Sequence, residues 1–121
     1  MRCVLPLLLF SLVTASGAAA QCKDAVSTKD MQDCADSEYK KADAELNSVY
    51  QATLKKLKPE DVGLLKKAQR AWLAYRDAHC DAQYHLFAGG SIAAVSLTQC
   101  RATLTAARAK EIKDSYTPQP Q

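Results

Sequence analysis

The sequence predicts an all-α fold, an antiparallel three-helix bundle stapled by two disulfides. Three apolar stripes with helical spacing follow one another along the chain, and short helix-breaking segments separate them. No run of alternating apolar and polar residues predicts a strand. The chain has 121 residues, of which 48% are apolar and 24% charged. This is an ordinary composition for one globular domain, and it argues against disorder.

The first helix is predicted to begin just after Ser27 or Thr28, either of which can cap it, with Asp30 favourable at the positive helix end. Its apolar positions are three or four residues apart, as one face of a helix requires. They are Met31, Ala35, Tyr39, Ala42, Leu46, Val49, Thr53 and Leu57. We expect Leu46 and Tyr50 to be core anchors.

The second helix is predicted to begin at Pro59, because proline suits the first helical position. Glu60 and Asp61 suit the positive end of the same helix. The apolar stripe comprises Leu65, Ala68, Trp72, Tyr75, His79, Ala82 and Leu86. We expect Trp72 and Tyr75 to be its core anchors.

The third helix is predicted to follow Gly89, Gly90 and Ser91, since glycine is favoured just past a helix end and serine at the start of the next helix. Its stripe comprises Leu97, Cys100, Leu104, Ala107 or Arg108, and Ile112. Short connections make sequential helices antiparallel neighbours. In that arrangement Asp43 faces Arg76, which predicts a structural ion pair, with a ligand-binding arginine as the alternative.

Residues 1–20 have the layout of a secretory signal peptide. Met1 and Arg2 precede a nearly unbroken apolar run at residues 4–13, and small residues lead to an A-x-A site ending at Ala20. The run is too short to span a bilayer stably, so we expect cleavage after Ala20.

Gln21 precedes Cys22 at the position where a lipobox has a small residue, which argues against a lipid anchor. The predicted location is therefore the periplasm or the secreted fraction, without membrane insertion after cleavage. The mature chain is expected to consist of a helical domain at residues 21–115 and a flexible tail at residues 116–121.

Five cysteines are present, and Cys3 leaves with the signal peptide. The remaining four predict two disulfides in an oxidising compartment, with three possible pairings. Cys80 and Cys100 should lie side by side across the turn at Gly90. A bond between Cys34 and Cys80 is disfavoured, because the expected axial offset of about 7.5 Å exceeds the reach of a disulfide. The preferred pairs are therefore Cys22–Cys34 and Cys80–Cys100.

Motifs for catalysis and for cofactors are missing from the sequence. It contains no glycine-rich phosphate loop and no nucleophile elbow, so we predict that the protein is not an enzyme and binds no cofactor. His79, Cys80 and His85 are close together but lack the spacing of a metal site. The net charge of +3 is too small to indicate nucleic-acid binding.

Charge is uneven along the chain. Acidic residues dominate from Asp24 to Glu45, and basic residues dominate from Lys55 to Arg76. We interpret this as two complementary helices packing together.

Several segments together resemble the LprI-type lysozyme-inhibitor domain of bacterial exported proteins. They are CADSEY at 34–39, DAELNSVY at 43–50, AQRAWLAYRDAHC at 68–80, the Gly-Gly-Ser turn at 89–91 and the late Cys100. The resemblance extends from about Cys22 to Ile112. It implies a disulfide-bonded helical domain of the periplasm or envelope that binds lysozyme and blocks its cleft. It also implies that the cysteines, Asp43, Trp72 and Arg76 are scaffold positions.

A lysozyme blocker needs a protruding element with few charges, and the segment from Tyr84 to Ser91 fits that need. The candidate partner-binding residues are Tyr84, His85, Phe87, Gly89, Gly90 and Ser91. Aromatic side chains often anchor interfaces, and glycine lets a backbone approach closely. Many lysozymes are basic, as this chain is, so affinity must come from local contacts such as the acidic first helix. The alternative is an envelope structural or stress-related protein with another protein partner.

Overall fold

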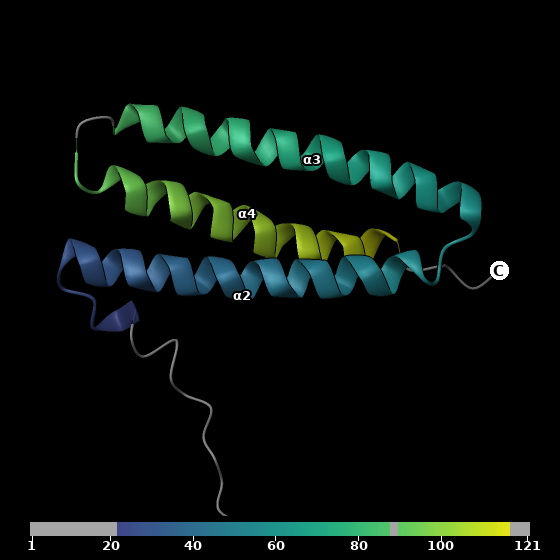
Figure 1. Cartoon of the computed structure of the whole chain (residues 1–121), viewed down its shortest axis with the longest axis horizontal. Coiled ribbons are helices and arrows are strands. Elements are labelled where there is room, and N and C mark those ends of the chain that lie inside the picture. Colours follow the sequence, from purple (N-terminus) through teal and green to yellow (C-terminus); the bar gives the residue numbers. More distant parts are fainter. Residues whose placement is uncertain (1–21, 88–89, 117–121) are drawn as a thin grey trace, which may run out of the picture.

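The computed structural model describes residues 22–87 and 90–116. Three helices account for most of this part of the chain: α2 (Thr28–Leu54), α3 (Pro59–Leu86) and α4 (Ala93–Ser115). The direction of the chain alternates, so that α2 and α4 run the same way and α3 runs against them (Figure 1). The described residues contain no strand, and the predicted all-α bundle is confirmed. The expected signal peptide, Gly89 and all but the first residue of the expected tail lie outside the described residues.

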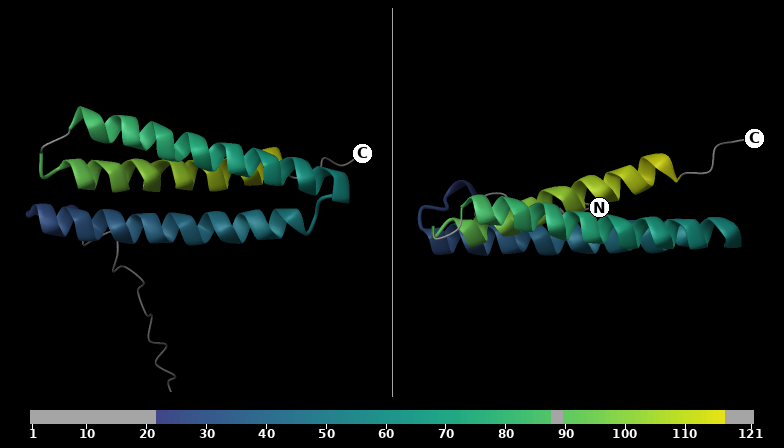
Figure 2. Two further views of the ribbon diagram at one scale, coloured as in Figure 1. Left: turned by 45° about the horizontal axis from the view of Figure 1, so that its top comes forward. Right: turned by 90° about the horizontal axis from the view of Figure 1, so that it is seen from above.

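Helix α4 packs against both other helices. Figure 2 shows it crossing α2 and α3 at an angle and emerging to one side of them toward its C-terminal end. Buried alanines, Ala35 and Ala42 on α2 and Ala102 and Ala109 on α4, explain its close approach to α2, because the distance between helix axes depends on side-chain size.

The apolar core lies between α2 and the C-terminal half of α4. Leu46, Val49, Ala109 and Ile112 form a buried cluster. Three partly buried aromatic side chains pack against this cluster: Tyr50, Trp72 and Tyr116. Leu46, Tyr50 and Trp72 thus occupy the positions expected of core anchors.

The predicted apolar stripe of α3 is correct at Leu65 and Trp72 but wrong at Tyr75, the second expected core anchor of this helix, and at Leu86. The buried residues of α3 are Leu65, Gln69, Arg76 and Cys80, whereas Tyr75 is 55% exposed and Leu86 is 81% exposed. A stripe chosen by apolarity passes over Gln69 and Arg76, which are buried because they find hydrogen-bond partners inside the bundle.

Two of the three helices begin with the residues that the sequence predicts. Ser27 and Asp30 form a capping box at α2, and Pro59 is the first residue of α3. Ser91, however, does not cap α4. The turn continues through Ser91, with the Ala93 N–H donating to the Gly90 carbonyl at 3.2 Å. Ile92 therefore takes the cap position without a side-chain hydrogen bond.

Both predicted disulfides are present. Cys22 joins Cys34 with a Cα–Cα distance of 5.3 Å, and Cys80 joins Cys100 at 5.7 Å. The first bond ties the segment before α2 to that helix, and the second ties α3 to α4. No helix among the described residues combines the length and apolarity needed to cross a membrane.

Candidate functional site

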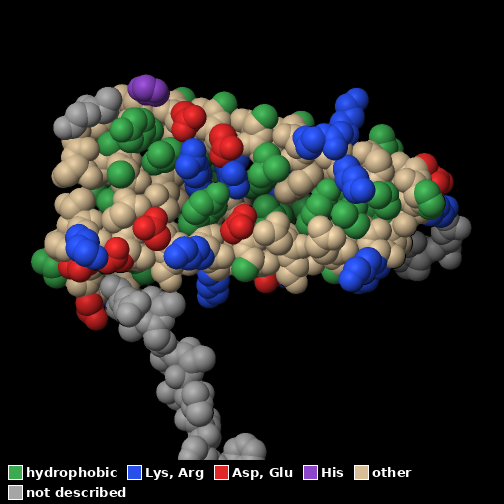
Figure 3. All heavy atoms as spheres, viewed as in Figure 1, with side chains coloured by type: hydrophobic (Ala, Val, Ile, Leu, Met, Phe, Trp, Pro, Cys, Tyr) green, Lys and Arg blue, Asp and Glu red, His purple; other side chains and the backbone are tan. Residues whose placement is uncertain are grey.

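The turn between α3 and α4 carries a cluster of exposed large apolar side chains. Tyr84, Leu86, Phe87 and Ile92 are all exposed, Phe87 by 49%; we call these four residues the apolar tip. Figure 3 shows hydrophobic side chains gathered at this end of α3. The tip presents apolar surface to solvent at the extremity of the bundle, where a partner can reach it.

The backbone of this turn is held by local hydrogen bonds. The Gly90 N–H donates to the Phe87 carbonyl at 3.1 Å, and the Phe87 N–H donates to the Tyr84 carbonyl at 3.0 Å. The imidazole of His85 lies edge-on to the Tyr84 ring, with 5.8 Å between ring centroids. Of the predicted partner-binding residues, Tyr84, His85, Phe87, Gly90 and Ser91 are therefore together and exposed in the described part.

The acidic first turns of α2 lie at the same end of the bundle. The Gln32 amide on α2 donates to the Thr98 hydroxyl on α4 at 3.0 Å, which places the start of α2 beside the start of α4 (Figure 1). Exposed carboxylates follow this start, and we call Asp30, Asp33 and Asp36 the acidic shoulder.

The capping box fixes the charge state of the first carboxylate of the shoulder. The Ser27 hydroxyl donates to Asp30 Oδ2 at 2.7 Å, and the Ser27 N–H donates to the same oxygen at 3.1 Å. Because both bonds favour the charged form, the pKa of Asp30 is lowered, first by the hydroxyl and then by the backbone. Asp30 is therefore held as a carboxylate at neutral pH, at the same end of the bundle as the apolar tip.

A groove between α3 and α4 begins at the apolar tip and runs toward the middle of the bundle. Its volume is about 530 Å³. It is lined by His79, Gln83, Leu86, Phe87, Ser96, Gln99, Cys100, Thr103 and Leu104. The His79 ring, which lines the groove, lies 3.4 Å from the Gln83 amide, and its other neighbour is the Tyr75 ring outside the groove, tilted against it with 5.5 Å between centroids. The groove extends the apolar surface that the tip offers to a partner.

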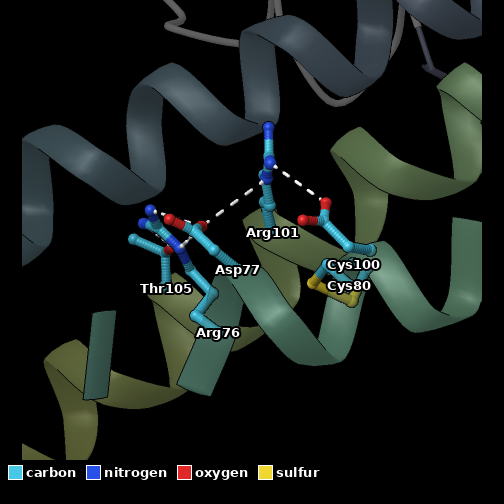
Figure 4. Close-up of polar contacts among 7 residues, drawn as sticks. Arg76, Asp77, Cys80, Cys100, Arg101 and Thr105 are labelled. Atoms are coloured by element: carbon cyan, nitrogen blue, oxygen red, sulfur yellow. Dashed lines mark hydrogen bonds and ion pairs between the residues drawn. A yellow bond between two sulfur atoms is a disulfide. The ribbon is translucent and has the colours of Figure 1, made fainter. Parts of the chain in front are cut away.

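The expected ion pair between Asp43 and Arg76 is not formed. Asp43 accepts a hydrogen bond from Asn47 on its own helix at 3.4 Å, and Arg76 pairs with Asp77 at 2.9 Å (Figure 4). The ring of Tyr39 lies under the Arg76 guanidinium, 5.7 Å from it. Tyr39 precedes Asp43 by one helical turn, so the register predicted for α2 and α3 was wrong by about one turn.

The buried arginines form a structural network around Trp72. The guanidinium groups of Arg76 and Arg108 lie 5.4 and 5.8 Å from the Trp72 ring. Arg108 also donates to Gln69 at 3.1 Å and pairs with Glu111 at 2.7 Å. The stripe predicted for the third helix included Arg108 only as an alternative to Ala107. The signal for its burial is the polar Gln69, which lies on the buried face of α3.

The other side of Arg76 connects to a surface network. Its Nη1 donates to the buried Thr105 hydroxyl at 3.4 Å, and its partner Asp77 also lies 3.7 Å from Arg101. Arg101 in turn reaches Asp81 at 3.5 Å (Figure 4). Since each guanidinium already has carboxylate partners, these arginines are engaged within the bundle and do not form an open anion site.

Potential metal ligands converge at one place in the described residues. The sulfurs of Cys22 and Cys34 and a Glu38 carboxylate oxygen lie within 4.8 Å of one another. Both sulfurs belong to a disulfide and are not thiolates, which are the form that binds a metal. This cluster therefore does not make a metal centre while the disulfide is intact.

The fold and the disulfides define a class: a small all-α domain with two disulfides, of the kind stable in oxidising compartments. Comparison with known families then identifies the family of the chain. The family model described as "Lysozyme inhibitor LprI" matches residues 18–112. The chain belongs to the LprI family, and the resemblance found in the sequence is confirmed.

Two curated proteins are similar to this chain. Uncharacterized protein R02472 of Rhizobium meliloti (strain 1021) is 39% identical over 132 residues, covering 94% of this chain and 95% of that protein. Uncharacterized protein YecT of Escherichia coli (strain K12) is 37% identical over 62 residues, covering 42% of this chain and 38% of that protein. No solved structure matches the chain.

Proposed function

We propose that this protein is an exported, non-enzymatic inhibitor that binds lysozyme and occludes its active-site cleft. Family membership supports the partner. The observation that carries the proposal is the apolar tip at the same end of the bundle as the acidic shoulder. We also propose that the signal peptide at residues 1–20 is removed and that the protein acts in the periplasm or outside the cell.

The apolar tip has the composition of an interface anchor. Tyr84 and Phe87 are aromatic, exposed and one helical turn apart at the end of α3, and aromatic side chains dominate the energetics of many interfaces. The tip is also the terminal turn at one end of an elongated molecule, as Figure 1 shows. A terminal turn can enter a cleft, and Leu86 and Ile92 enlarge its apolar area.

Local charge provides the electrostatic complement. The whole chain carries +3, which disfavours long-range attraction to a basic lysozyme. The acidic shoulder nevertheless places three carboxylates at the same end of the bundle as the tip, one of which, Asp33, is paired with Lys29. Charge pairs at the rim of an interface influence association rate and salt dependence more than affinity. We therefore expect complex formation to slow as the salt concentration rises.

The test is a titration of the oxidised mature protein, residues 21–121, into lysozymes of several classes while cell-wall lysis is followed. We expect saturable inhibition near one-to-one stoichiometry. Tyr84→Ala and Phe87→Ala should each weaken binding by about 30-fold or more if both act as hot spots. Tyr75→Ala is the matched control, because Tyr75 is an exposed aromatic residue of the same helix outside the tip; it should change binding by less than about twofold.

Two outcomes would contradict different parts of the proposal. Inhibition that both tip variants leave intact would assign binding to another surface. No complex with any lysozyme would remove lysozyme as the partner and favour an envelope protein with another protein partner. Cross-linking in the cell envelope would then identify that partner.

A further inference from the structure

The end of the bundle opposite the apolar tip is strongly basic. Six cationic side chains and two acidic ones occur at residues 55–70, around the α2–α3 turn and the first turns of α3. The cations are Lys55, Lys56, Lys58, Lys66, Lys67 and Arg70, and all are exposed; we call them the basic end. Figure 3 shows Lys and Arg side chains predominating over the half of this face nearest the α2–α3 turn.

Within residues 22–87 and 90–116, these six cations have no carboxylate partner. In the part of the chain that the structure describes, none of them forms an ion pair or a side-chain hydrogen bond. Elsewhere on the surface, Lys29 pairs with Asp33 and Lys110 pairs with Asp114. The positive field of the basic end is therefore not cancelled locally, and it is available to an anionic partner.

An exposed leucine stands among these lysines. Leu64 is 65% exposed, and the neighbouring Gly63 has open space where a side chain would be. Leu64 borders a hollow of about 340 Å³ that Leu57, Lys56, Lys58 and Tyr116 also line. The surface thus combines unpaired cations, an apolar side chain that stands clear of the bundle, and a shallow depression.

We propose that the basic end docks on an anionic phospholipid surface, with the lysines at the headgroups and Leu64 in the interfacial region. Lysines close to an anionic leaflet each favour binding, and an apolar side chain gains by entering the boundary of the acyl chains. A soluble acidic polymer would also bind the lysines, but contact with Leu64 would not strengthen its binding. The leucine therefore favours the lipid surface over the polymer.

This docking is independent of lysozyme binding. Helix α3 has 28 residues, so the basic end and the apolar tip are about 40 Å apart. Both ends can be occupied at once, which would leave the apolar tip facing away from the membrane. A failure of either proposal leaves the other standing.

The experiment measures binding of the oxidised mature protein to phosphatidylcholine vesicles with and without phosphatidylglycerol, by co-sedimentation. We expect binding to the anionic vesicles alone, and its loss at high salt. The variant Lys56→Gln/Lys58→Gln/Lys67→Gln should reduce partitioning by about 100-fold, since each lysine near the surface contributes about fivefold.

A matched variant separates the basic end from net charge. Lys23→Gln/Lys29→Gln/Lys40→Gln removes the same charge from exposed sites away from the basic end and should reduce partitioning by less than about fivefold. Equal losses in the two variants would overturn the proposal, as would equal binding of the wild type to both kinds of vesicle or no binding to either. Unchanged far-ultraviolet circular dichroism would establish that both variants fold.

Leu64→Gln tests the choice of a lipid surface over an acidic polymer. We expect it to lower vesicle partitioning by about tenfold and to leave binding to soluble polyphosphate unchanged. Equal affinity of Leu64→Gln and wild type for the anionic vesicles would overturn the insertion of Leu64 and assign the basic end to polyanions in general.

Discussion

Replacing Arg76 by methionine tests whether the guanidinium stabilises the bundle. Methionine keeps an apolar stem of similar length, so the change isolates the charged head. The substitution removes the ion pair with Asp77, the hydrogen bond to Thr105 and the cation–π contacts with Tyr39 and Trp72. The side chain is 8% exposed, so water cannot replace these contacts in the folded state.

The size of the effect follows from these contacts. A hydrogen bond to a charged group contributes about 1.5–3 kcal/mol, and each cation–π contact about 0.5–1 kcal/mol. The burial of the guanidinium opposes them, because desolvation of a charge is costly. Asp77 is half-exposed and regains water when its partner is removed. We therefore expect Arg76→Met to lower the free energy of unfolding by about 2–3 kcal/mol, or the melting temperature by about 10–15 °C.

Urea unfolding of the oxidised mature protein at pH 7 measures this change, and a pair of double-mutant cycles assigns it. Arg76→Met and Asp77→Asn should couple by about 1 kcal/mol, whereas Arg76→Met and Asp43→Ala should be additive within about 0.5 kcal/mol. An Arg76→Met protein as stable as wild type would refute the reasoning. So would a stronger coupling to Asp43 than to Asp77.

Three further predictions concern the scaffold. Replacing Cys80 and Cys100 together by alanine should lower the unfolding free energy by about 3 kcal/mol, measured by urea titration of the oxidised proteins; no loss would contradict a stabilising bond. Ile112→Ala should lower it by about 3 kcal/mol, because Ile112 is fully buried; a loss below about 1 kcal/mol would mean that the core collapses around the gap. Ser27→Ala should cost about 1 kcal/mol at pH 7. Because the folded-state pKa of Asp30 is lowered, the part of this contribution that comes from the bonds of Ser27 to the Asp30 carboxylate is present above about pH 4 and is lost as the pH falls through that pKa. Thermal melts at pH 7 and pH 2.5 should therefore show a smaller difference at the lower pH.

The fold was predictable because its elements have strong local signals. The stripe of α2 was predicted correctly in its buried members, since these are apolar residues, such as Ala35, Leu46 and Val49. The pairing of Cys80 with Cys100 was predictable because a short turn fixes the register of α3 and α4. Two residues equidistant from Gly90 then lie side by side.

The sequence did not predict which polar residues are buried inside the bundle. Gln69 and Arg76 are buried on α3 and satisfied by Arg108, Thr105 and Asp77, three residues from two helices. A one-dimensional pattern ranks such residues as solvent-facing, because the partners on α4, Thr105 and Arg108, are distant in the sequence. The register of α3 against α2 was predicted from the position of the turn near Pro59, and it was wrong by about one turn because Tyr39, not Asp43, lies at Arg76.

The candidate site was predictable in its residues but not in its surroundings. The sequence indicated an aromatic, glycine-containing turn at Tyr84–Ser91, and the structure adds the exposed Leu86 and Ile92. It also brings the acidic shoulder to the same end, through the contact between Gln32 and Thr98. That contact joins residues 66 positions apart, so no local feature of the sequence predicts it.

The uneven charge along the chain has a different meaning from the one predicted. The acidic and basic segments were expected to pair as complementary helices. Instead, α2 runs from the acidic shoulder at one end to the turn with Lys55 and Lys56 at the other, and Lys66 and Lys67 follow the acidic first turn of α3 at that second end. A sequence-wise separation of charge thus becomes a separation between the two ends of the molecule. Charge that is not used for packing remains available for binding, which is why we propose a different partner for each end.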